Sequence, residues 1–225
     1  GPSENTEYGQ VIHDALEEFL KTRQMPSNES LRAQLTKMFS VLPNASEIKE
    51  ADWHDTIEPV LSEVPAFMDE TFGSDWEYIA AEYPLMETLE RHDHMFKGFI
   101  DGIIKAKNKK GEEVVWIIDW KTCSWGWDAQ KKSDKMTVYQ LSLYKEFLSK
   151  KFNIDLKNID TYFILLKRTA KKNRVEILPI TNGQKRLDNS MKLLTDAITN
   201  IQKGFVIKNR LSCDNCEFKN TEHCK

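Results

Sequence analysis

Two aspartates and a lysine lie close together in the stretch from residue 96 to residue 122. Asp101 falls within one apolar run, and Asp119 and Lys121 end the next one. Successive side chains of a strand point to opposite faces, so Asp119 and Lys121 project together while Trp120 enters the other layer. Carboxylates suit a hard divalent cation, and an adjacent lysine can position or activate a water molecule. We therefore interpret the stretch as a β-hairpin that carries a metal-dependent hydrolytic centre.

A surface ion pair at the end of a strand is the alternative interpretation of Asp119 and Lys121. The residues just before them, 114–118, form a continuous apolar block that is typical of a strand buried on both faces. A carboxylate at the end of such a strand is costly to bury without a partner. For this reason we favour the catalytic interpretation.

Two further pairs of side chains have helical spacing. His13 follows Gly9 by four residues and Tyr144 follows Gln140 by four, so each pair shares one face of a helix. A glycine one turn before His13 would let another backbone or a ligand approach the imidazole. Taken alone, a histidine on a helix more often packs than binds a metal, and a tyrosine on an amphipathic helix often only packs.

The apolar periodicity predicts the elements that would position these groups. Residues 76–89 could form a strand that carries Glu82, or a short helix, and Pro84 favours an edge strand. We expect helices over residues 8–21, 30–41, 53–72, 136–151 and 183–203, and strands over residues 95–105, 113–121, 160–166 and 174–180. The helical segment 53–72 should be broken or bounded near Pro59 and Pro65. This mixed order predicts an α/β fold with a central mixed sheet flanked by helices.

The chain has 225 residues and 40% apolar content, which is enough for one large domain. Residues 1–3, Gly-Pro-Ser without an initiator methionine, are typical of the scar left when an expression tag is removed. We expect a single domain over residues 4–225, with a helical insertion at about residues 28–74 and a cysteine-containing tail at residues 211–225.

The composition is not that of a membrane or secreted protein. No apolar run reaches 18 residues and no signal-peptide pattern opens the chain, so we expect no membrane partner and an intracellular location: the cytoplasm or nucleoid, or the host-cell cytoplasm for a phage-encoded protein. The formal net charge of −3 argues against a uniformly basic surface but not against nucleic acid. Two local basic strips could contact phosphates or could simply be solvated loops: Lys105, Lys107, Lys109 and Lys110, and Lys167, Arg168, Lys171, Lys172 and Arg174.

Four motifs occur in a fixed order, each on the type of element that suits it: Gly9-x-x-x-His13, Gly98-x-x-Asp101, Asp119-x-Lys121 and Gln140-x-x-x-Tyr144. In this order the chain resembles the RecB-like branch of the PD-(D/E)XK nuclease superfamily, which includes AddB-like and CRISPR-associated exonucleases. The resemblance covers most of residues 8–150. It implies a restriction-endonuclease-like fold with a helical insertion in the N-terminal part.

The resemblance also implies roles for the first three motifs. Asp101 and Asp119 would be carboxylate ligands of a divalent cation, and His13 would add an imidazole ligand from the first helix. Lys121 would orient or activate the attacking water. Carboxylates suit Mg²⁺, and an added histidine makes Mn²⁺ an alternative.

Five further residues are candidates for the border of the site. Gln140 and Tyr144 match a helix motif that borders the active site and contacts substrate. Glu82 lies where some relatives have an acidic residue ahead of the Gly98-x-x-Asp101 strand. There it would contact the metal ligands and not the metal itself. Trp125 and Trp127 could stack on bases of a single strand or could anchor their loop by packing.

The cysteine tail resembles the cluster-binding tail of iron–sulfur members of the same family, with Cys213, Cys216 and Cys224 as ligands. Those relatives take a fourth cysteine from upstream of the first motif. Three explanations stay open: the fourth ligand was lost upstream, His223 or Cys123 completes a zinc or iron–sulfur site, or the tail holds no metal. Because three cysteines do not close a tetrahedral site, we favour a reduced or metal-free tail.

We expect a Mg²⁺- or Mn²⁺-dependent DNA nuclease, specifically an exonuclease acting on single-stranded DNA or DNA ends in recombination, repair or phage DNA metabolism. The chain has no P-loop, so any ATP-driven unwinding would come from a helicase or recombination partner protein. Two alternatives stay open. One is a non-catalytic DNA-binding or structural subunit of a larger complex, and the other is a nuclease that acts on RNA.

Overall fold

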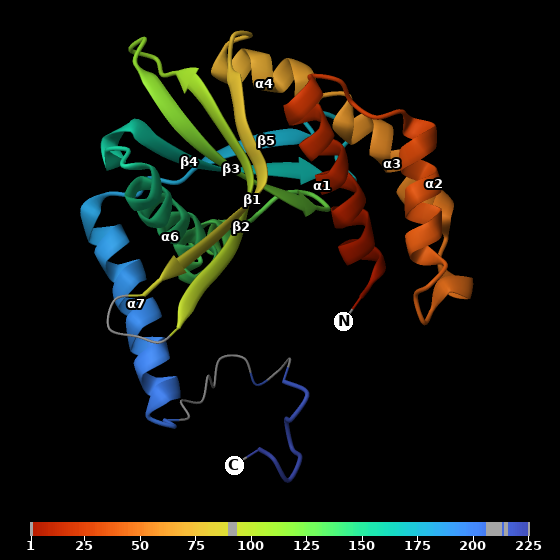
Figure 1. Ribbon diagram of the computed structural model, residues 1–225. Coiled ribbons are helices and arrows are strands. Elements are labelled where there is room, and N and C mark those ends of the chain that lie inside the picture. The colour runs from red at the N-terminus through yellow and green to blue at the C-terminus, as the bar shows by residue number, and fades with distance from the viewer. Residues whose placement is uncertain (1, 90–93, 206–212, 214–215, 225) are drawn as a thin grey trace.

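The structure, a computed structural model, describes residues 2–89, 94–205, 213 and 216–224. Its centre is a five-stranded sheet in the order β1-β2-β3-β4-β5 (Figure 1). The strands are β1 (Glu77–Thr88), β2 (Met95–Lys107), β3 (Glu113–Cys123), β4 (Ile159–Lys167) and β5 (Val175–Pro179). Only β3 and β4 pair in parallel, and the other neighbours are antiparallel. The predicted mixed sheet is thereby confirmed.

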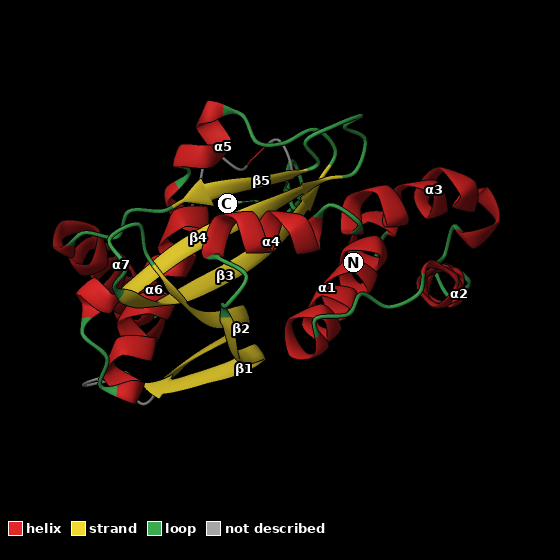
Figure 2. Ribbon diagram, turned by 90° about the horizontal axis from the view of Figure 1, so that it is seen from above, coloured by secondary structure: helices red, strands yellow, loops and turns green. Residues whose placement is uncertain are grey.

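Helices cover both faces of this sheet (Figure 2). On one side lie α1 (Glu4–Thr22), α2 (Asn28–Phe39), α3 (Glu50–Leu61) and α4 (Val64–Phe72). On the other side α6 (Lys135–Phe152) packs on the sheet and α7 (Gln184–Gln202) packs on α6. Short pieces complete the order: α5 (Ala129–Ser133) and the 3₁₀ turns η1 (Ala45–Glu47) and η2 (Leu156–Asn158). None of the helices in the described ranges is long and apolar enough to cross a membrane.

The apolar block of β3 lies between two separate cores, as its sequence predicts. Trp116 and Ile118 pack with the α1–α4 layer, and Ile117 packs with α6. Trp120 continues the first core, on the face opposite to Asp119 and Lys121. Two covered faces explain why residues 114–118 of this strand are all apolar.

The expected break within residues 53–72 lies beside one of the two prolines. The chain forms two helices separated between Leu61 and Val64, with Pro65 in the first turn of α4 and Pro59 kept inside α3. Proline needs no N–H partner in a first helical turn, which favours a new helix there. Between β3 and α6, where no helix was expected, lies α5, which starts where the Asp128 carboxylate accepts the N–H of Lys131 at 2.7 Å.

Candidate active site

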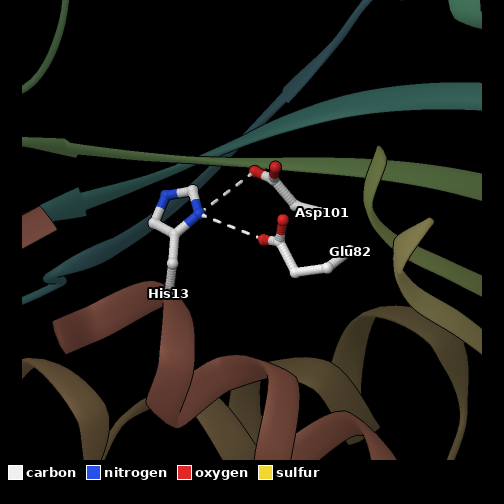
Figure 3. A group of neighbouring side chains, drawn as sticks. All are labelled: His13, Glu82 and Asp101. Atoms are coloured by element: carbon white, nitrogen blue, oxygen red, sulfur yellow. Dashed lines mark ion pairs between the residues drawn. The ribbon is translucent and has the colours of Figure 1, made fainter. Parts of the chain in front are cut away.

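Three side chains from three different elements meet at one end of the sheet (Figure 3). His13 comes from α1, Glu82 from β1 and Asp101 from β2. His13 Nδ1 lies 3.6 Å from Asp101 Oδ2 and 3.9 Å from Glu82 Oε1. In the described part of the chain this is the one group of three or more histidine, cysteine or acidic residues close enough to hold a metal ion, with ligand atoms within 4.8 Å of one another.

The packing of α1 explains how His13 reaches this point. The helix starts at Ser3, whose hydroxyl accepts the N–H of Thr6 at 3.3 Å. Gly9, one turn before His13, faces β3: a Cβ at this position would lie 3.4 Å from Thr122 Oγ1. The Gly9-x-x-x-His13 spacing therefore lets α1 lie against the end of β3 with the imidazole at the same end of the sheet.

Glu82 reaches the group through an unusual backbone conformation. Its φ is 45°, in the left-handed region, and it lies between the paired residues Ala81 and Tyr83 of the edge strand β1. For a residue with a Cβ, this conformation is less stable than the right-handed one by about 1–2 kcal/mol. Such strain persists where the surrounding structure enforces it, which is common at functional sites. Figure 3 shows the resulting carboxylate directed toward His13 and Asp101.

Asp101 is held where the β2–β3 ladder ends. The last paired residues on this side are Gly102 and Ile118. Beyond them, Asp101 Oδ2 accepts the backbone N–H of Trp120 at 2.8 Å. The side chain thus replaces a missing ladder partner, which fixes the Asp101 carboxylate relative to β3.

Asp119 and Lys121 form an adjoining ion pair. Asp119 is 1% exposed, and its Oδ1 lies 2.5 Å from Lys121 Nζ. Its Oδ2 is buried and has no hydrogen-bond partner in the described residues. An unpartnered carboxylate oxygen this deep in a protein is costly, so it is available for a ligand that brings positive charge.

The pKa values of the site reflect a buried excess of negative charge. Burial, together with the charge of Asp119, raises the pKa of Asp101 from 3.8 to about 7, and burial also raises the pKa of Asp119. Burial by itself lowers the pKa of His13, but Glu82, Asp101 and Asp119 outweigh it and the pKa is raised. In Lys121 burial is likewise outweighed, by Asp119, so the raised pKa keeps the ammonium form.

This set of groups fits a hard divalent cation. Carboxylate oxygens and one imidazole are the donors that Mg²⁺ and Mn²⁺ accept. A bound cation would relieve the repulsion that raises the pKa of Asp101. Asp119 is not one of the three residues of this group. His13, Asp101 and Asp119 were expected as ligands from the sequence, and Glu82 only as a supporting residue. The geometry groups Glu82 directly with His13 and Asp101.

Gln140 and Tyr144 lie on α6 beside this group. Gln140 Nε2 donates to Tyr144 Oη at 3.0 Å. The Tyr144 ring packs directly on β2, because a Cβ at Gly98 would lie only 2.6 Å from Tyr144 Cε1. Burial raises the pKa of Tyr144, and the charges of Asp119 and Asp101 add to this effect. Gly98 on β2 therefore leaves the space that the Tyr144 ring of α6 occupies.

The other candidate residues are dispersed. Trp125 is 71% exposed, whereas the Trp127 ring packs on Phe163 with the ring centroids 5.2 Å apart. The Cys123 thiol contacts the carbonyl oxygen of Leu166 at 3.8 Å, and burial raises its pKa. In the tail, the described residues Cys213, Cys216 and Cys224 are exposed and form no metal-ligand group with one another, Cys123 or His223. Residues 206–212, 214–215 and 225 lie outside the described part of the chain.

The chain is similar to known proteins over nearly its whole length. A family model described as the PD-(D/E)XK nuclease superfamily matches residues 2–221. The crystal structure of a proposed exonuclease from Eubacterium rectale has a TM-score of 0.57 and 11% identity, covering 97% of this chain and 74% of that one, which shows a shared fold. The crystal structure of SSO0001 has 14% identity and covers 97% of this chain and 85% of that one, but its TM-score of 0.40 supports no argument. No curated protein matches the sequence.

Proposed function

The chain belongs to the PD-(D/E)XK nuclease superfamily, and from this premise we propose that it is a divalent-metal-dependent DNA nuclease of the RecB-like branch. We propose that it is an exonuclease hydrolysing phosphodiester bonds of single-stranded DNA or of DNA ends, in recombination, repair or phage DNA metabolism. The observation that supports this most directly is the meeting of His13, Glu82 and Asp101 beside the buried pair of Asp119 and Lys121.

In this proposal Asp101, Asp119 and His13 hold the cation, and Glu82 adds a carboxylate from the edge strand. When bound, the cation would make a water molecule more acidic and stabilise negative charge on the phosphoryl oxygens. The hydrogen bond from Trp120 N–H keeps Asp101 in place for this role.

Lys121 acts as an ammonium in the proposed mechanism. Its Nζ lies at the Asp119 carboxylate, and its raised pKa favours the charged form. From there it can donate a hydrogen bond to the attacking water or to a phosphoryl oxygen, where negative charge develops. Gln140, held by its hydrogen bond to Tyr144 Oη, would contact the substrate at the border of the site.

One time course tests activity, substrate and metal together. End-labelled single- and double-stranded DNA and RNA are incubated with Mg²⁺ or Mn²⁺ and the wild-type protein, Asp119→Ala or Lys121→Ala. We expect shortening of labelled DNA from an end, and a loss of at least about 100-fold in both variants, as is typical when a group that stabilises transition-state charge is removed. Asp196→Ala, on the exposed surface of α7, is the control and should cleave like the wild type.

Three outcomes would overturn parts of the proposal. Absence of metal-dependent DNA cleavage, with binding retained, favours a non-catalytic subunit. Cleavage of RNA in preference to DNA replaces the proposed substrate. Full activity in Asp119→Ala and Lys121→Ala removes the proposed site.

A further inference from the structure

A pocket lies between α1 and the ends of β3 and β4. Resting on the proposed function, we infer that this pocket binds a phosphate group of the nucleic acid strand, away from the bond that is cleaved. The pocket is lined by Asn5, Tyr8, Thr122, Cys123, Ser124 and Arg168. None of these side chains carries a negative carboxylate, and one is a permanent cation.

The guanidinium of Arg168 is stacked but not paired. Its central carbon lies 4.1 Å from the ring centroid of Trp53 and 5.9 Å from that of Tyr8. Every other arginine in the described residues donates a side-chain hydrogen bond to a protein oxygen: Arg23 to Trp76, Arg32 to Asp55, Arg174 to Glu63 and Arg186 to Thr181. Within the same residues the Arg168 guanidinium has no oxygen partner. Stacking leaves the N–H groups at the edge of the plane free to donate.

The position of Arg168 is fixed by its neighbours. Its backbone N–H donates to the Cys123 carbonyl at 2.8 Å, and the N–H and hydroxyl of Thr169 donate to the Ser124 carbonyl at 3.0 and 2.8 Å. The aromatic platform is also constrained, because the Tyr8 and Trp53 rings lie 5.5 Å apart. A cation held this way loses little side-chain entropy when it binds a ligand.

The remaining lining groups suit a phosphate. The hydroxyls of Thr122 and Ser124 and the amide of Asn5 are neutral donors that surround a single cation. A planar guanidinium can donate two parallel hydrogen bonds to phosphate oxygens, which adds geometric specificity to the charge attraction. The chemistry of the pocket therefore matches an oxyanion with several acceptor oxygens.

The pocket is close enough to the metal site to be filled by the same strand. Thr122 directly follows Lys121 on β3, with its side chain on the opposite face of the strand, toward α1. On α1, Tyr8 and Asn5 precede His13 by about 8 and 12 Å along the axis at about 1.5 Å per residue. A DNA strand advances by about 3.4 Å of axis per nucleotide in a duplex. A phosphate a few nucleotides from the cleaved bond can thus reach Arg168, either as an internal phosphodiester or as a terminal phosphate.

Binding without cleavage tests this inference. Fluorescence anisotropy of a labelled single-stranded DNA is measured in EDTA at several salt concentrations for the wild type, Arg168→Gln and Arg168→Lys. We expect Arg168→Gln to bind at least about tenfold more weakly, as is typical for a lost charge-assisted hydrogen bond, with a salt slope shallower by about 0.7. Arg168→Lys keeps the charge but not the planar donor pair, so an intermediate loss is expected. The matched control is Arg32→Gln, in which the same change removes an arginine already paired with Asp55.

Neutral phosphate substitutions identify the phosphate itself. Oligonucleotides carrying one methylphosphonate at each position in turn, and oligonucleotides with and without terminal phosphates, are compared on the wild type and Arg168→Gln. At one position the neutral group should weaken binding to the wild type but not to Arg168→Gln. An internal position identifies a phosphodiester, and an end position identifies a terminal phosphate.

The outcomes separate this inference from the proposed function. If the wild type neither binds nor cleaves nucleic acid, the proposed function and the phosphate pocket both fail. If the wild type cleaves, but Arg168→Gln and Arg168→Lys both bind with wild-type affinity and salt slope, only the pocket is overturned. If Arg168→Gln does not fold, Arg168→Lys takes its place in the methylphosphonate experiment. A neutral phosphate position that weakens binding to Arg168→Lys less than binding to the wild type supports the pocket, and equal effects at every position overturn it.

Discussion

The Asp101 carboxylate destabilises the fold that holds it. Its folded pKa of about 7 lies above the ordinary value of 3.8, because burial and the charge of Asp119 disfavour ionisation. The folded protein therefore binds this proton more tightly than the unfolded chain, so the free energy of unfolding falls as pH rises from about 4 through 7. In EDTA at pH 8, Asp101→Asn should raise the melting temperature by about 2–8 °C, which corresponds to about 1–2 kcal/mol.

Melting curves between pH 5 and pH 8 measure this effect. The advantage of Asp101→Asn over the wild type should shrink toward pH 5, where the wild-type carboxyl is protonated in the folded protein. Asp196→Asn on the surface of α7 serves as the control and should change little at any pH. A gap between Asp101→Asn and wild type that stays constant with pH would contradict a raised pKa at Asp101.

Two substitutions distinguish the effect of the left-handed backbone at Glu82 from the effect of its carboxylate. Glu82→Ala and Glu82→Gly both remove the carboxylate, but only glycine adopts a φ of 45° without strain. We expect Glu82→Gly to be more stable than Glu82→Ala by about 1 kcal/mol in denaturant melts. Both should show a smaller rise in melting temperature on adding Mn²⁺ than the wild type, because a proposed ligand is missing.

The control for Glu82 is Glu70→Ala, which removes an exposed carboxylate of α4. Its response to Mn²⁺ should equal that of the wild type. Unchanged Mn²⁺ stabilisation in Glu82→Ala would show that Glu82 takes no part in metal binding. Equal stability of the alanine and glycine variants would show that the backbone conformation stores no strain.

The contact between β2 and α6 depends on a missing side chain at Gly98. A Cβ there would lie 2.6 Å from Cε1 and within 3.3 Å of Oη and Cζ of Tyr144, a residue that is 5% exposed and cannot easily move. Gly98→Ala should therefore destabilise the protein by about 1–3 kcal/mol and lower the cleavage rate by displacing Tyr144. Urea denaturation and the cleavage assay measure the two effects.

Gly102 offers a matched control on the same strand. A Cβ at Gly102 would meet the end of the flexible Leu20 side chain, Cδ1, at 2.8 Å, and that methyl group can shift. Gly102→Ala should cost less stability than Gly98→Ala and should leave Tyr144 in place. The reverse order of stability would mean that the Tyr144 ring yields more readily than its burial suggests.

The elements with strong local patterns could be predicted from the sequence. The β2–β3 hairpin, α1 and α6 follow from apolar periodicity that needs no distant contact. A break near Pro59 and Pro65 was expected between α3 and α4, but only packing decides that Pro59 is kept inside a helix and that the break lies beside Pro65. The short helix α5 depends on one local cap in a polar segment, which a loop assignment overlooks.

The candidate site also contains residues that could be predicted from the sequence and features that could not. Residue types and spacing singled out His13 and Asp101, and the structure brings these two together with Glu82. Glu82 has a left-handed φ of 45° within β1, where a strand pattern predicts extended backbone. Arg168 appeared only as part of a basic strip, because its unpaired state depends on stacking against Trp53, which is distant in sequence. Features that depend on long-range contacts were the ones that sequence patterns could not supply.

The two helical layers of the molecule are tied to one sheet, and this predicts cooperative unfolding. In the α1–α4 layer, Phe72 packs on Trp116 and Tyr162 with ring centroids 5.5 and 5.9 Å apart. In the opposite layer, Phe147 stacks on Phe96 at 4.6 Å. If residues 4–225 are one domain, Phe72→Ala and Phe147→Ala should each lower the free energy of unfolding by about 3–5 kcal/mol.

Phe72→Ala and Phe147→Ala should each shift one unfolding transition that involves the whole domain. Urea denaturation is followed by tryptophan fluorescence, to which Trp53, Trp76, Trp116 and Trp120 in the core of the α1–α4 layer contribute, and by far-ultraviolet circular dichroism, which reports on all helices. The two signals should coincide in the wild type and in both variants, because the sheet is shared by the two cores. Phe205→Ala, at a side chain that is 62% exposed, should change stability by less than about 0.5 kcal/mol. If Phe72→Ala moved the fluorescence transition alone, residues 28–74 would be an insertion that unfolds independently, and the single-domain prediction would be wrong.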